Sequence, residues 1–209
     1  MPCDQLHFLS LVHGKYLLTG FDFPKELTIG RVLGRGGFCV VSEVTKITLS
    51  KGEEEKQQSK KCDDEHYIHN VVQDRGFMAS HCIRGKGRDC RYAIKRMQDA
   101  SRKDPQTFIN AIVDLAVEAR FLAVVRHPNI IKMRAMSNGD PYSPDFFVVL
   151  DRLYDIMPVR LQKWKKQNKT GLVKLMFDRQ GKKQQAFWVE RLTVAYDIAC
   201  ALNYLHGLR

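Results

Sequence analysis

The sequence lacks any run of about eighteen consecutive apolar residues, which is the length that a membrane-spanning helix needs. Its N-terminus also lacks the basic start and clean apolar stretch of a secretory signal peptide, because Gly14 and Lys15 interrupt the apolar pattern. The six cysteines show no paired spacing of the kind found in disulfide frameworks. We therefore expect an intracellular, cytoplasmic chain with free thiols and no membrane partner.

Negative charge is the scarcer kind, since 23 Asp and Glu residues oppose 34 Lys and Arg residues and leave a formal net charge of +11. This charge suits an anionic ligand such as a nucleotide, and it also suits nucleic acid. The basic residues form only short clusters, with no basic stripe interleaved with aromatic side chains, so nucleic acid is the less favoured partner. The length of 209 residues allows one domain, or a small domain with part of another.

A polar stretch at about residues 48–90 shows little apolar periodicity and contains clusters of acidic residues and glutamine. We expect a flexible surface insertion there. Its Cys62-x3-His66-x2-His69 spacing contains zinc-ligand residue types, but it matches no standard zinc finger and lacks the second cysteine of a pair. We therefore predict no metal site.

Outside this stretch, strand-like and helical patterns follow one another. The expected strands are 26–34, 38–45, 92–97, 130–133 and 146–150, and the expected helices are 105–125, 159–169 and 186–207, with 170–185 as a loop. Asp104 and Pro105 form a favoured start for the first helix. The last helix is apolar nearly all round, which predicts burial on every side. We expect that the sequence is cut off before the layer that would cover this helix.

Two segments carry the chemistry: Leu33-Gly34-Arg35-Gly36-Gly37-Phe38-Cys39-Val40-Val41 and Arg91-Tyr92-Ala93-Ile94-Lys95. A glycine lets the backbone approach a polyanion closely, because no Cβ atom stands in the way. Backbone N–H groups and one lysine ammonium then supply donors and positive charge for phosphate groups. Taken alone, the glycine segment is equally compatible with an ordinary hairpin turn.

The order of glycine hairpin, lysine strand, helix, two strands and further helices resembles the small lobe of eukaryotic protein kinases. The resemblance implies an α+β fold with an antiparallel five-stranded sheet and one helix, followed by the first helices of an incomplete large lobe. It divides the chain into an N-terminal extension (1–25), a small lobe with the flexible insertion (26–153) and the start of the large lobe (154–209).

The resemblance also implies a site for ATP. The residues that match it are Leu33, Gly34, Gly36, Phe38, Val41, Ala93, Lys95, Leu150, Asp151 and Leu153. In the family the glycine loop covers the phosphates and the lysine pairs with a glutamate of the helix, which is matched by Glu118, with Asp114 as the alternative. Leu150 takes the position beside the adenine pocket, and the carbonyl of Asp151 and amide of Leu153 contact the adenine edge. Cys39 departs from the family, which has a third glycine there.

The 209 residues contain no His-Arg-Asp triplet and no Asp-Phe-Gly triplet. The catalytic base and the Mg²⁺ ligands of the family therefore have no counterparts, and we expect Mg²⁺ only in a complete kinase. The first hypothesis is the ATP-binding portion of a serine/threonine kinase, inactive as this chain alone. The alternative is a non-catalytic, pseudokinase-like module that binds a nucleotide or a protein. In neither case does the sequence identify the protein substrate or partner.

Overall fold

The computed structural model describes residues 19–49, 65–84, 89–175 and 182–208. The chain forms two compact units, of which the first runs to residue 126 and resumes at 131–152. The second unit comprises residues 127–130 and 153–209. The first unit is an α+β structure that contains every strand of the described chain, and the second is helical.

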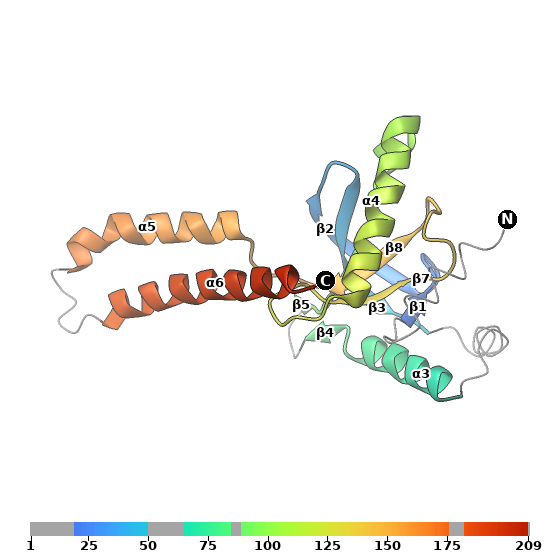
Figure 1. Ribbon diagram of the computed structural model, residues 1–209, viewed down its shortest axis with the longest axis horizontal. Coiled ribbons are helices and arrows are strands. Elements are labelled where there is room, and N and C mark those ends of the chain that lie inside the picture. Colours follow the sequence, from blue (N-terminus) through green and yellow to red (C-terminus); the bar gives the residue numbers. More distant parts are fainter. Residues whose placement is uncertain (1–18, 50–64, 85–88, 176–181, 209) are drawn as a thin grey trace. The chain divides into compact units, whose positions relative to one another are not determined.

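The first unit is organised around a six-stranded sheet with the order β1-β7-β8-β6-β3-β2 (Figure 1). Its strands are β1 (Thr19–Phe21), β2 (Leu27–Arg35), β3 (Cys39–Ile47), β6 (Tyr92–Met97), β7 (Met133–Ser137) and β8 (Phe147–Asp151). All neighbours in the sheet are antiparallel except β1 and β7, which are parallel. The α+β class predicted from the sequence is confirmed, and β6 has the bounds expected for it.

The expectation of a five-stranded, wholly antiparallel sheet was wrong, because β1 adds a sixth strand at the edge. Thr19, Gly20 and Phe21 pair in parallel with Ala135, Met136 and Ser137 of β7. Three residues are too few to show a period of two, and Thr-Gly is not typical of a buried strand. All three residues of β1 are nonetheless buried, and the Phe21 side chain in the core is fully inaccessible to solvent. β7 also starts later than expected, at Met133 rather than Ile130.

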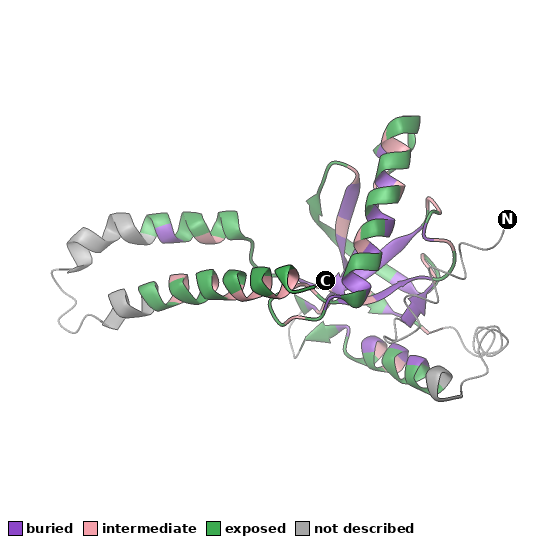
Figure 2. Ribbon diagram, viewed as in Figure 1, coloured by how far each residue is buried: buried purple, intermediate pink, exposed green. Residues whose placement is uncertain are grey.

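Helix α4 (Pro105–Val124) packs against β6 and β7 and follows a short 3₁₀ turn, η1 (Asp99–Arg102). The predicted start is confirmed: the Asp104 carboxylate accepts a hydrogen bond of 2.8 Å from the Thr107 amide, and Pro105 opens the helix. A buried stripe runs along α4 in Figure 2, and most of its residues are alanines. The buried residues are Ala111, Leu115, Ala116, Ala119, Leu122 and Ala123.

Helix α3 (Glu65–Ser80) lies within the stretch expected to be a flexible insertion. That expectation was wrong for Glu65–Arg84, because this segment packs onto the sheet and continues into the small hairpin of β4 (Ile83–Arg84) and β5 (Asp89–Cys90). Figure 1 shows α3 and α4 on opposite sides of the sheet. Met78 and Cys82 join the core that includes Val44, Ile94 and the other side chains on the α3 side of the strands. Residues 50–64, with Cys62 of the zinc-like spacing, lie outside the described residues.

A buried ion pair anchors α3 to the start of the sheet. Arg75, 8% exposed, pairs with Glu26, which is 1% exposed and precedes β2. The Arg75 guanidinium also donates to the Gly20 carbonyl and lies 4.8 Å from the centroid of the Phe21 ring. The second carboxylate oxygen of Glu26 accepts a hydrogen bond of 2.9 Å from the Asp22 amide. Burial of both charges is tolerated because each has polar partners in the interior.

The second unit contains the helices α5 (Met157–Leu175) and α6 (Lys182–His206). α5 extends through residues expected to form a loop. None of the described residues 188–206 of α6 is buried, so the burial that its apolar pattern calls for is not supplied within the described residues. Asn129 joins this unit by donating to the Asp197 carbonyl oxygen at 3.0 Å. No helix in the described part of the chain is both long and apolar enough to cross a membrane.

We expect the buried thiols to resist alkylation. Burial raises the pKa of Cys82 to about 11 and also raises the pKa values of Cys39 and Cys90, so little thiolate exists at pH 8. Among the four cysteines of the described residues, iodoacetamide should modify the half-buried Cys200 first, with peptide mass mapping as the measurement. Labelling of Cys82 should accelerate as the pH rises towards 11. Equal rates at Cys82 and Cys200 in the folded protein would contradict this packing.

Candidate nucleotide site

The α4-facing side of the sheet brings together four of the residues predicted to form the site: Val41, Ala93, Lys95 and Leu150. Strand register places Val41 of β3, Lys95 of β6 and Val148 of β8 side by side in one cross-strand row. The next row on the same side contains Ala93 and Leu150, because alternate residues of a strand point to the same face. Ala93 and Leu150 are buried, Val41 is half-buried, and together they form an apolar surface beside one lysine.

Lys95 pairs with Glu118 of α4 through its ammonium group and the Oε2 atom of the carboxylate. The side chains are 24% and 34% exposed, so the pair is accessible to a ligand. Asp114, the alternative partner, is exposed and lies one helical turn before Glu118 on the same face of α4. The helical cap and the alanine-rich stripe fix the position of α4, and this position sets Glu118 against β6. The catalytic role attached to these two residues stays a prediction.

The glycine loop is the turn between β2 and β3, closed by a hydrogen bond of 2.8 Å from the Gly36 amide to the Cys39 carbonyl. Gly34, Gly36 and Gly37 have no positive φ angle. A Cβ atom on Gly34 or Gly37 would meet nothing within 4 Å, and one on Gly36 would meet only the Cys39 carbonyl at 3.6 Å. Neither backbone conformation nor packing within the described residues therefore requires these glycines. Leu33 and the glycines are exposed, and Phe38 is half-buried.

Cys39 stands where the kinase glycine loop has its third glycine. It is the first residue of β3 and is 8% exposed. Burial raises the pKa of its thiol, and the nearby Lys95 ammonium offsets part of this rise. The side chain is thus a neutral, apolar contribution next to the Lys95 and Glu118 pair at neutral pH. It adds no negative charge that would repel phosphate groups.

The segment expected to contact adenine begins at the end of β8. The Asp151 carboxylate forms two hydrogen bonds of 2.8 Å with Arg134, and the Asp151 amide donates to the Lys132 carbonyl at 3.0 Å. The side chain of Asp151 is thus engaged within the sheet, in keeping with a role for its backbone alone. Leu153 is the first residue of the second segment of the helical unit and is 62% exposed.

Glu43 is a charged residue near the site that the sequence reading missed. It lies in the same cross-strand row as Ala93 and is 8% exposed. Its Oε1 atom lies 2.7 Å from Nε of Arg31 and 3.0 Å from the guanidinium of Arg152, which directly follows Asp151. This arrangement ties β3 to the end of β8. The sequence could have indicated this position, because Glu43 follows Val41 by two residues in a strand and therefore lies on the same face.

Among the described residues, no group of three His, Cys, Asp or Glu side chains is placed to hold a metal ion, and we assign no Mg²⁺ ligand to them. No known family model matches the sequence, and none of the curated proteins is significantly similar to it.

Proposed function

We propose that the first unit binds ATP as the small lobe of a serine/threonine protein kinase. The observation that carries the proposal is the accessible Lys95 and Glu118 pair, which lies on the same face of the sheet as the apolar residues Val41, Ala93 and Leu150. A base needs an apolar slot, and phosphates need a cation that is itself held in place. Both features occur within two cross-strand rows.

Each part of the site has a separate role in this proposal. The Lys95 ammonium binds phosphate oxygens, and the Glu118 carboxylate keeps that ammonium oriented towards α4. The glycine loop supplies backbone N–H groups at the end of the β2–β3 hairpin. In the complete kinase, ATP would supply the phosphoryl group that is transferred to a protein hydroxyl. We place this reaction in the cytoplasm, where ATP is available.

The alternative is a nucleotide- or protein-binding module without catalysis. It is favoured by one observation, the lack of His-Arg-Asp and Asp-Phe-Gly triplets in these 209 residues. Neither proposal assigns a catalytic base to this chain. Measurable phosphoryl transfer by the purified 209-residue chain would show that a base has been overlooked.

Calorimetric titration with ATP tests the proposal, with Lys95→Met as the central variant. We expect the Kd for ATP to rise about 10- to 100-fold, because a charge-assisted hydrogen bond contributes about 1.5–3 kcal/mol. Lys46→Met is the matched control, since Lys46 is an exposed residue of the neighbouring strand β3. It removes the same charge and should leave the Kd unchanged.

Two results would contradict the proposal. Wild-type protein that binds no ATP at millimolar concentration would refute nucleotide binding. Equal affinities of wild type and Lys95→Met would refute the role of Lys95, even if ATP binds.

A further inference from the structure

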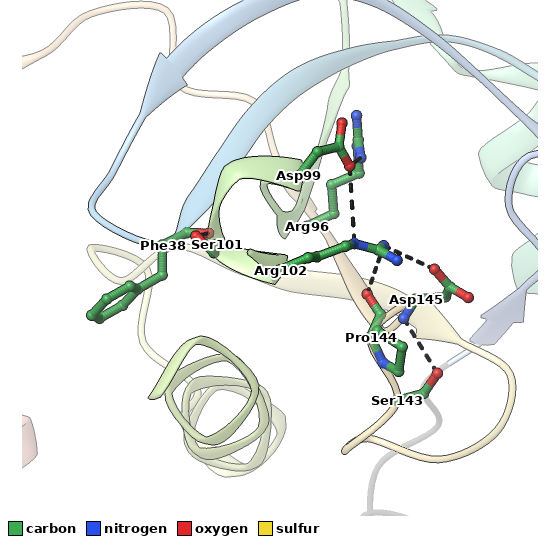
Figure 3. A network of polar contacts seen from close by, with 8 residues as sticks. All are labelled: Phe38, Arg96, Asp99, Ser101, Arg102, Ser143, Pro144 and Asp145. Carbon is green, nitrogen blue, oxygen red and sulfur yellow. Dashed lines mark hydrogen bonds and ion pairs between the residues drawn. The ribbon is translucent and has the colours of Figure 1, made fainter. Parts of the chain in front are cut away.

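The glycine loop is tied to the segment that follows β6. The Gly37 carbonyl accepts a hydrogen bond of 2.7 Å from the Gln98 side chain. The Phe38 carbonyl accepts two hydrogen bonds: one from the backbone N–H of Gln98 at 3.0 Å and one from the Ser101 hydroxyl at 3.1 Å. Figure 3 shows the Ser101 side chain of η1 directed at the backbone of Phe38. Ser101 is 2% exposed, so its hydroxyl is held in the interior.

These contacts also set the direction of the neighbouring N–H groups. The one cis peptide bond among the described residues is Phe23–Pro24, so the loop peptides are trans. In a trans peptide the N–H points opposite to the C=O. With the carbonyls of Gly37 and Phe38 held by Gln98 and Ser101, the N–H groups of Phe38 and Cys39 point away from that segment. Carbonyl oxygens repel a phosphate and N–H groups attract it, so this orientation matters for an anion.

The segment that holds the loop is itself anchored. Arg102 of η1 donates to the Pro144 carbonyl at 3.0 Å and to the Asp145 carboxylate at 2.9 Å, both in the β7–β8 connection (Figure 3). Asp99 adds longer ion pairs to Arg102 at 3.9 Å and to Arg96 of β6 at 3.8 Å. The glycine loop is therefore connected through Gln98 and η1 to the β7–β8 connection.

We propose that Gln98 and Ser101 are positioning residues for phosphate binding: they keep the carbonyls of the glycine loop turned away, so that the N–H groups of Phe38 and Cys39 donate to the phosphates of ATP. This inference rests on the proposed function. It adds two residues to the set that determines the affinity for phosphate groups. Both are uncharged, and both lie outside the glycine loop. They act through the backbone of the loop and do not touch the ligand.

The double variant Gln98→Ala/Ser101→Ala tests this role by calorimetry with two ligands, ATP and adenosine. We expect the Kd for ATP to rise about tenfold, because two side-chain hydrogen bonds that hold the loop are lost. The Kd for adenosine should stay within about twofold of the wild-type value, since adenosine carries no phosphate. In NMR spectra, ATP and not adenosine should shift the amide resonances of Phe38 and Cys39 in the wild type, and less so in the variant.

Matched controls remove the same chemical groups elsewhere. Gln106→Ala and Ser80→Ala delete side chains that make hydrogen bonds within α4 and α3, and the Kd for ATP should not change. If ATP binds the wild type and the double variant equally, or if the variant loses adenosine as much as ATP, the positioning role is refuted. If the wild type binds no ATP, the proposed function fails first and the inference falls with it.

Discussion

Replacing Glu26 by alanine is expected to lower the free energy of unfolding of the first unit by about 3–5 kcal/mol. The carboxylate is 1% exposed and pairs with Arg75, so its removal leaves a guanidinium in the interior without this counter-charge. The loss also affects the Asp22 amide, which donates to Glu26. Stability of a typical domain is only about 5–15 kcal/mol, so this single change would remove a large part of it.

The measurement is urea unfolding followed by far-UV circular dichroism and by hydrogen exchange of β2 and β3 amides. Tryptophan fluorescence does not serve, because Trp164 and Trp188 both lie in the second unit. Arg31→Ala is the control, since it breaks another ion pair of the same unit at a largely exposed residue and should have a much smaller effect.

The double variant Glu26→Leu/Arg75→Met distinguishes a charge effect from a packing effect. Replacement of both members of a buried pair by apolar residues of similar size is often neutral, so most of the lost stability should return. A small loss in Glu26→Ala, comparable to that of Arg31→Ala, would show that α3 is not held on the sheet by this pair.

Periodicity and capping predicted the helices and strands whose sequence pattern lies within the element itself. β6 and α4 are such cases: the short apolar run Tyr92–Ile94 begins β6, α4 has apolar residues at helical spacing, and Asp104 with Pro105 marks the helix start. β1 is too short to show a pattern. α3 was missed because its attachment depends on Arg75, a residue type normally assigned to the surface.

The candidate site divides in the same way. The glycines, Lys95 and Glu118 were predicted because their residue types and spacing resemble a known arrangement, and the structure shows Lys95 paired with Glu118. Gln98 and Ser101 act through backbone carbonyls some sixty residues earlier in the chain, and no local pattern predicts which residues will meet them. Glu43 was missed because a single acid in a strand gives no sign of its distant partner, Arg152.

Ile94 and Lys95 are neighbours on β6 that should respond in opposite ways to substitution. Ile94 is fully buried in the core on the α3 side, so Ile94→Ala should lower the free energy of unfolding by about 2–5 kcal/mol. Lys95→Met removes a partly exposed ion pair and should change stability by about 1 kcal/mol or less while weakening ATP binding.

Urea unfolding of Ile94→Ala, Ile94→Val and Met78→Ala shows whether α3 completes that core. Ile94→Val deletes one methylene group and should cost only about 0.5–1.5 kcal/mol, which calibrates the larger loss. Met78 of α3 is 4% exposed in the same cluster, and Met78→Ala should cost about 2–5 kcal/mol. If Ile94→Ala is strongly destabilising and Met78→Ala is not, the sheet folds without α3. If both lose comparable stability while Lys95→Met does not, the two faces of β6 contribute differently: Ile94 stabilises the fold together with α3, and Lys95 contributes little to stability.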